Sequence, residues 1–253
     1  MRITKKSTLM GVVGLTTTAV ASLILAVPGS AGAAPVPISA VEKYELYLSG
    51  KAKAGDTGAT EVLSDFRGLA DSKKEDFVEY VQNPEVSKAF TEVLSGGSGD
   101  EENFVPEQRK ELYGGDVVIE SEYNVEDLGD TGGISAMGAA GAQGTAGDKR
   151  AWHSVSDTIF GIKVTKVTIG VNYKTTATRT TKVYSGWAAH TNYVPLSEFD
   201  NSPVQKWISA DPGNNAHAET IWKGKLASGF TWSCRHRVWA DQDGYKGGYL
   251  KRV

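Results

Sequence analysis

A single cysteine is present among the 253 residues, so no intrachain disulfide can form. The chain must therefore be stabilised by burial of apolar side chains, which a protein of this length can achieve. The lone thiol, Cys234, lies where apolar and polar residues alternate, and period-two spacing places it on the apolar face. We expect a buried, unreactive thiol there; an intermolecular disulfide is the alternative. The residues that share its face are Phe230, Trp232, His236 and Val238.

Long apolar runs are scarce, and the one that stands out lies near the amino terminus. Residues 9–27 are mostly apolar; they follow a positively charged start and precede small residues that a signal peptidase can cleave. This pattern predicts a removable secretory signal over residues 1–33, with the cut between Ala33 and Ala34. A membrane anchor is the alternative, but three threonines dilute the apolar segment and no stop-transfer charge follows it. We therefore expect a secreted, extracellular protein without a membrane span in its mature form.

Tryptophan and histidine are absent from the first 149 residues; all six tryptophans and all four histidines lie beyond them. Charge is divided in the same way. Residues 34–148 hold 9 Lys plus Arg against 23 Asp plus Glu, a net charge of −14, whereas residues 149–253 hold 15 against 7, a net charge of +8. This asymmetry indicates two segments of different kinds. One hypothesis is that the acidic half docks on the basic half and masks it as a pro-region, because a tether raises their effective concentration.

The acidic half, residues 34–126, has the periodicity of helices. Apolar residues recur at spacings of three and four, and residues that cap helix starts precede them. A segment from Asp116 to Val125 alternates as a strand does. We expect a small helical domain. The predicted helix starts are the capping boxes Ser39–Glu42 and Ser72–Glu75 and the pair Asn83–Pro84.

Residues 127–149 have the composition of a linker. They include seven glycines and five alanines but no aromatic residue. Such a segment cannot bury enough apolar surface to offset the conformational entropy lost on folding. We therefore expect a flexible, protease-sensitive connection between two domains.

The basic half, residues 150–253, has the pattern of β-strands. Six or seven short strands separated by turn residues predict an immunoglobulin-like sandwich, with a small β-barrel as the alternative. Between Val164 and Val167 the alternation changes phase, which predicts a β-bulge. Residues 190–203 are expected to form a loop. The predicted fold class is thus α + β in separate segments.

Sequence motifs for catalysis are incomplete. Gly129–Gly133 resembles the sequence around the nucleophile of trypsin-like proteases, but threonine replaces serine and no histidine precedes it. His217–Glu219 resembles part of a zinc deaminase motif, and Cys234 with His236 could ligate a metal, yet no second cluster of suitable spacing accompanies either. Asp241–Gly244 resembles part of a calcium loop but is better explained as a hairpin turn. We expect no catalytic residue, metal or cofactor; a secreted hydrolase is the less favoured alternative.

Tryptophans beside cations are the strongest functional feature of the basic half. Arginines alternate with Trp232 on one predicted strand, and lysines alternate with Trp222 on the strand before it. We expect these two tryptophans in the core, with cations and an aromatic edge on the opposite face. Such a face could bind an anionic polymer or stack on sugar rings. The residues predicted to form it are Lys223, Lys225, Arg235, Arg237 and Trp239.

The layout as a whole resembles secreted proteins of high-GC Gram-positive (actinobacterial) bacteria that lack an assigned function. The shared features are an alanine-rich signal, an acidic helical segment and a tryptophan-rich β-domain; the resemblance transfers no site residue. From the residues themselves we expect a non-catalytic extracellular binding protein that engages an anionic or glycan surface such as a cell-wall polymer. A protein-directed effector, either an antibacterial toxin or a protease inhibitor, is the alternative. No specific nucleic-acid partner is predicted.

Overall fold

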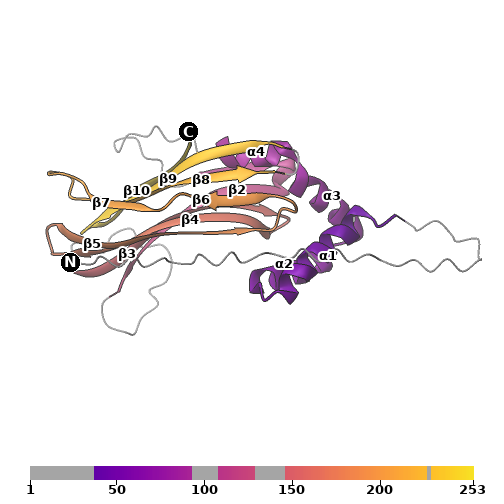
Figure 1. Ribbon diagram of the computed structural model, residues 1–253, viewed down its shortest axis with the longest axis horizontal. Helices are drawn as coiled ribbons and strands as arrows, with labels where there is room; N and C mark the ends of the chain where they lie inside the picture. The colour runs from indigo at the N-terminus through magenta and orange to yellow at the C-terminus, as the bar shows by residue number, and fades with distance from the viewer. Residues whose placement is uncertain (1–36, 93–107, 129–145, 227–228) are drawn as a thin grey trace, which may run out of the picture. The chain divides into compact units, whose positions relative to one another are not determined.

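Four helices begin the described part of the chain. The computed structural model describes residues 37–92, 108–128, 146–226 and 229–253. The predicted signal peptide and its cleavage site lie outside these residues. The helices are α1 (Ala40–Lys53), α2 (Thr57–Gly68), α3 (Asp71–Gln82) and α4 (Pro84–Glu92), shown in indigo to purple in Figure 1.

The first and last helix starts are those that the sequence predicts. Ser39 caps α1 by accepting the N–H of Glu42, whose carboxylate in turn accepts the N–H of Ser39. Asn83 Oδ1 accepts the N–H of Glu85 at 2.9 Å, and proline occupies the first position of α4. These contacts satisfy backbone donors that have no partner inside the helix.

The capping box predicted at Ser72 is wrong. Helix α3 begins at Asp71, so Ser72 lies inside its first turn, and no side chain caps the helix at Ala70. The apolar face of α3, with Phe77 and Val81, is fully packed in the core. The packing of this face outweighs the local cap in placing the start of the helix.

In the described part of the chain, the first sheet consists of five antiparallel strands that follow one another in chain order. A 3₁₀ turn, Tyr113–Gly115, joins its first two strands. The phase change predicted between Val164 and Val167 is confirmed, because the register of β3 on β4 skips one residue opposite Asp157 and Thr158. The strands are β1 (Arg109–Leu112), β2 (Val117–Asp127), β3 (Gly147–Ile159), β4 (Ile162–Thr175) and β5 (Thr180–Asn192).

The second sheet has β8 and β9 at its centre and β10 at one edge. Two short strands, β6 and β7, pair with successive parts of β8 along its other edge. The segment 190–203, predicted as a loop, thus contains β6 and the end of β5. The strands are β6 (Glu198–Asn201), β7 (Gln205–Ile208), β8 (Ala216–Lys225), β9 (Thr231–Asp241) and β10 (Gly244–Arg252).

The order of the described strands corrects two expectations. The chain completes one sheet before it starts the other, whereas the immunoglobulin fold exchanges strands between its sheets through Greek-key connections. Neither sheet of described strands closes on itself, so the alternative of a small barrel is also wrong. The described protein is mostly β, with helices at its amino-terminal end and two antiparallel sheets.

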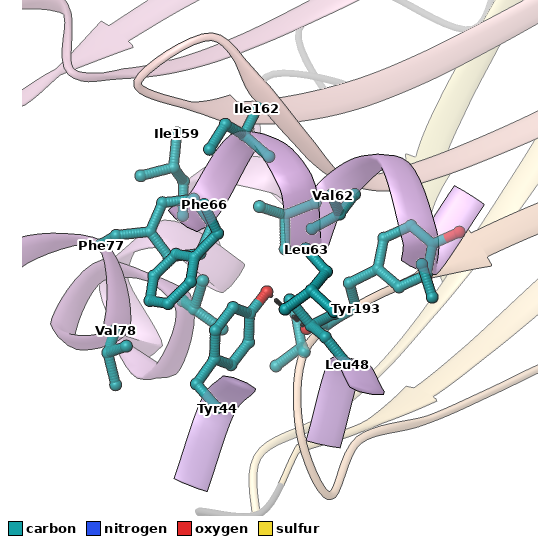
Figure 2. Close-up of a cluster of buried hydrophobic side chains, with 14 of the residues drawn as sticks. Tyr44, Leu48, Val62, Leu63, Phe66, Phe77, Val78, Ile159, Ile162 and Tyr193 are labelled. Atoms are coloured by element: carbon teal, nitrogen blue, oxygen red, sulfur yellow. Dashed lines mark hydrogen bonds between the residues drawn. The ribbon is translucent and has the colours of Figure 1, made fainter. Parts of the chain in front are cut away.

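Apolar side chains of helices and strands share one core. Tyr44 of α1 and Phe66 of α2 lie in the same buried cluster as Ile159 and Ile162, which flank the β3–β4 turn. Figure 2 shows these rings and aliphatic chains converging, with the Tyr44 hydroxyl donating a hydrogen bond of 3.1 Å to the carbonyl of Tyr193. Two further clusters contain residues from both sheets.

The predicted division into a helical domain at 34–126 and a β-domain at 150–253 is corrected by these contacts. Residues 38–253 form one compact unit. Strand β2, from the acidic half, pairs with β3 along all of its 11 residues. The predicted linker therefore begins and ends inside paired strands; its residues 129–145 lie outside the described part of the chain. The apolar face of β2 can be buried only by elements from both halves, so the change in charge does not mark a domain boundary.

Ion pairs across the two halves are concentrated beside this strand pairing. Lys149 Nζ lies 2.6 Å from Asp127 Oδ1, and Lys166 Nζ lies 3.3 Å from a carboxylate oxygen of Glu122. When the chain is divided between residues 148 and 149, where the balance of charge changes sign, each acid lies in the acidic part and each base in the basic part. The opposite charges therefore support a shared fold, in place of the detachable mask that the charge asymmetry predicted.

A buried pair of imidazoles connects the two sheets. His153 Nδ1 of β3 lies 2.8 Å from His236 Nε2 of β9, and the indole N–H of Trp222 donates to His236 Nδ1 at 3.1 Å. All three side chains are buried. They form a continuous hydrogen-bonded chain through the interior.

The longest of the described helices, α1, has 14 residues, and none of the described helices has the length and apolarity of a membrane span.

Candidate functional site

The cations predicted to form a binding face lie on two neighbouring strands. Strands β8 and β9 pair in a register that places Lys225 opposite Thr231 and Lys223 opposite Ser233. Because successive side chains point to opposite faces of a sheet, these four residues share the outer face. Trp222 and Trp232, on the inner face, are buried as the sequence predicts.

A trough about 520 Å³ in volume lies at this end of the second sheet, where it is lined by outer-face residues of β8 and β9 and also by Gly224 and Trp232 of the inner face. Its floor is low because Thr231 and Ser233 of β9 have short side chains. The longer side chains of Lys223 and Lys225 border it on β8. Arg252 borders it at the end of β10, where its register opposite Cys234 places it on the inner-face side of the sheet. Hydroxyl groups below and cations beside the trough can together hold a ligand that has both hydroxyl and anionic groups.

Two carboxylates border the trough on its β6 side. Glu198 lies opposite Lys225, and Asp200 lies opposite Lys223, in the antiparallel register of β6 and β8. Both lysines are exposed, and neither forms an ion pair of 4 Å or less within the described ranges. The lysine ammonium groups are therefore available to a ligand. The sequence pattern missed Glu198 and Asp200 because it predicted a loop there.

The two arginines of the predicted face are already engaged with a neighbouring acid. Glu219 of β8 accepts a hydrogen bond of 2.7 Å from Arg237 Nε, and its other oxygen lies 3.4 Å from Arg235 Nε. One carboxylate thus partly neutralises two guanidinium groups. Arg235 and Arg237 belong to the face, as predicted, but they offer less positive charge to a ligand than the two lysines do. The β8–β9 register, which places Glu219 opposite Arg237, is what reveals this partner.

The predicted role of Trp239 as an exposed aromatic edge is corrected. Trp239 lies on the outer face, yet only 3% of its surface is exposed, because it packs over Gly247 of β10. The ring of His217 stacks beside it, and Trp207 of β7 lies parallel to His217 with ring centroids 4.8 Å apart. The accessible ring of this stack is the half-buried Trp207. The guanidinium carbon of Arg237 lies over this ring, 5.1 Å from the ring centroid.

The residues considered for metal binding are not arranged as a metal site. Within the described residues no group of three or more His, Cys, Asp or Glu side chains could hold a metal ion. Burial lowers the pKa of His217 to about 4, with Arg237 adding to the effect. Cys234 is buried as expected, and burial raises the pKa of its thiol to about 12, which leaves it an unreactive thiol.

Two other motifs from the sequence have separate outcomes. Asp241–Gly244 forms the turn of the β9–β10 hairpin, in which Asp241 accepts the N–H of Asp243 at 2.8 Å. The protease-like Gly129–Gly133 segment lies outside the described residues.

Comparison with protein-family models, with curated protein sequences and with solved structures found no match. The class of protein is described by the geometry of the described residues: two antiparallel sheets, helices that share a core with them, and a trough at one end of the second sheet that is bordered by three cations and two carboxylates.

Proposed function

We propose that this chain is an exported, non-catalytic binding protein whose trough binds an acidic glycan. The observation that carries the proposal is the convergence of Lys223, Lys225 and Arg252 on a hydroxyl-lined cavity of about 520 Å³. Export is supported by the signal-like composition of residues 1–33. We also propose that the two sheets form a β-sandwich, since side chains of both contribute to common buried clusters.

The mixture of groups around the trough favours an acidic sugar chain over other anionic polymers. Three cations attract a carboxylate, sulfate or phosphate group, while Glu198 and Asp200 repel one. Sugar hydroxyls can donate hydrogen bonds to these two carboxylates. They can both donate hydrogen bonds to the hydroxyls of Thr231 and Ser233 and accept hydrogen bonds from them. A polyanion without hydroxyl donors would leave the two carboxylates unsatisfied beside its own charges.

Binding to immobilised polygalacturonate tests the proposal directly. The chain from residue 34 onward is expected to bind at low salt and to elute as salt rises towards 1 M, where electrostatic screening acts over about 3 Å. The double variant Lys223→Ala/Lys225→Ala is expected to bind about tenfold more weakly, roughly 1.4 kcal/mol for two charge-assisted contacts at a solvated site.

A matched control is available on the first sheet. Lys174 and Lys182 lie opposite each other on β4 and β5, and both are exposed. Lys174→Ala/Lys182→Ala removes the same charge from another face and is expected to leave binding unchanged. Equal losses in the two double variants would show that only net charge matters, and retention on neutral dextran as strong as on polygalacturonate would refute the acidic ligand.

A further inference from the structure

A second cavity, about 660 Å³ in volume, lies at the open side between the edge strands of the two sheets. The end of β5 and the start of β6 form two of its walls. Helix α1 and the turn between α1 and α2 contribute Tyr47, Lys51 and Asp56. Its lining therefore combines both halves of the sequence, which is why no pattern within either half predicted it.

The helical wall of this cavity is held in place by buried tyrosines. Tyr193, directly after β5, receives a hydrogen bond on its carbonyl from Tyr44 and donates its own hydroxyl to Asp56 at 3.1 Å. Asp56 also caps α2 by accepting the N–H of Ala59. The backbone and side chains of this wall are thus fixed before any ligand arrives, which reduces the entropy lost on binding.

Lys51 supplies a positioned cation. Its ammonium group lies 5.6 Å from the ring centroid of Tyr47 and 5.7 Å from that of Tyr193. No ion pair within the described ranges involves Lys51. Two ring faces therefore orient a charge whose hydrogen-bonding capacity is left for a ligand.

The opposite wall adds an imidazole and an exposed apolar side chain. His190 is stacked on Phe199, and its ring edge contacts Trp222. Burial lowers the pKa of His190, and the positive charge of Lys51 lowers it further, whereas the negative charge of Asp200 opposes them. At neutral pH the ring is therefore an uncharged hydrogen-bond donor and acceptor. Leu196, 84% exposed, projects from the β5–β6 loop at the rim with a positive φ of 57°.

The two cavities adjoin each other across β6. Glu198 lines both the trough on the second sheet and this second cavity. On β6, Asp200 lines only the trough, whereas Phe199 lines only the second cavity. This short strand is thus the ridge between two cavities that each contain at least one lysine, and Glu198 is their shared acceptor.

We infer that the two cavities are subsites of one groove that takes a linear acidic oligosaccharide across β6. The inference rests on the proposed function and extends it by naming a chain-like ligand that is longer than the trough. One anionic sugar would lie against Lys223 and Lys225, another against Lys51, and a hydroxyl of the sugar between them would donate to Glu198. Leu196 offers an apolar contact for the less polar face of a sugar ring.

Oligogalacturonides of increasing length, titrated into the chain from residue 34 onward by calorimetry, test this inference. Affinity is expected to rise with length until one molecule spans both cavities. Lys51→Ala is expected to weaken the longer oligomers about fivefold and to leave the shortest that binds unchanged. Lys53→Ala, an exposed lysine two positions further along α1, is the matched control and should change neither.

The possible outcomes separate the inference from the proposed function. Affinity that is independent of length, with no effect of Lys51→Ala on any oligomer, would overturn the extended groove while leaving binding in the trough intact. Absence of binding at every length would overturn both. Glu198→Gln gives a second readout. A glutamine still accepts a hydrogen bond from a sugar hydroxyl, so affinity should still rise with oligomer length in this variant. If that length dependence disappeared while the short oligomer still bound, the result would also count against the groove.

Discussion

At the scale of single residues, the hydrogen bonds of the buried imidazole pair determine which ring nitrogens of His153 and His236 carry a proton. An indole N–H can only donate, so His236 Nδ1 must accept from Trp222 and carry its own proton on Nε2. That proton is donated to His153 Nδ1, so His153 carries its proton on the far nitrogen. An added proton on either Nδ1 would face another donor, and the chain of bonds would break.

The protonation of these groups predicts a loss of stability in acid. Burial lowers the pKa of His153 to about 3 and holds that of His236 well below 6.5, with the charge of His153 adding to the effect. Their contribution is complete above the unfolded-state pKa of about 6.5 and is lost as pH falls towards the folded-state values. Asp157 acts in the opposite sense: burial raises its pKa to about 7, so its protonation below pH 7 restores stability. The pKa values of His217 and His190 are also lowered, so four imidazoles outweigh one carboxyl and acid destabilises the fold.

His153→Leu is expected to make this pH dependence shallower. Removing one buried imidazole should reduce the slope of the unfolding free energy by about 1.4 kcal/mol per pH unit between about pH 6 and pH 4. Urea unfolding at a series of pH values measures the slope. His190→Gln, at an exposed ring outside the pair, should leave most of the slope in place; identical slopes for His153→Leu and the unmodified chain would contradict the assignment.

At the scale of elements, close contacts between tryptophan and glycine shape the second sheet. Trp232 lies over Gly224 on the inner face, and a Cβ atom at position 224 would come within 2.1 Å of the indole ring. Trp239 covers Gly247 on the outer face in the same way. A glycine opposite each ring lets the indole lie flat on the neighbouring strand, which restores the contacts that the glycine lacks.

Gly224→Ala is expected to destabilise the protein by roughly 1–3 kcal/mol, because the added methyl group overpacks the Trp232 contact. Gly50→Ala in α1 is the control: its Cβ would meet nothing within 4 Å, and alanine should stabilise the helix by about 0.5–1 kcal/mol. Chemical unfolding of both variants checks the two signs. An unchanged free energy of unfolding in Gly224→Ala would mean that the tryptophan ring can move aside freely.

The alternation of apolar and polar residues predicted which side of a strand faces inward. It missed strand β6, which is stabilised by pairing with a neighbouring strand. Trp232, Cys234 and Val238 are buried as period-two spacing indicates. Strand β6, by contrast, has only four residues, two of them acidic, and lacks an apolar pattern. It is held as a strand by pairing with β8, where its acids lie opposite lysines.

At the scale of the whole molecule, the two oppositely charged halves form one fold. Their contact combines the β2–β3 pairing, a shared apolar cluster and several ion pairs. Salt screens exposed ion pairs but does not weaken backbone pairing or apolar burial in the same way. The assembly of the halves should therefore not depend on charge.

A chain cut at an engineered protease site between residues 129 and 145 tests this expectation. The two pieces are expected to elute together in gel filtration even near 1 M salt, and to separate only when urea unfolds them. Coelution at low salt with separation at high salt would mean that the halves associate by charge alone, as the composition by itself predicted.

The sequence by itself determined the local features: the helix starts at Ser39 and Asn83, the bulge near Val164, the buried thiol and the inward tryptophans. Each of these depends on neighbours within a few positions along the chain. Tertiary structure alone decided that helices and strands share a core, that Glu219 engages the arginines, that Trp239 is covered, and that a second cavity adjoins the trough. These features depend on strand register and on packing between residues far apart in sequence. The periodicity of apolar side chains shows which face of an element is apolar, but it does not show which other element covers that face.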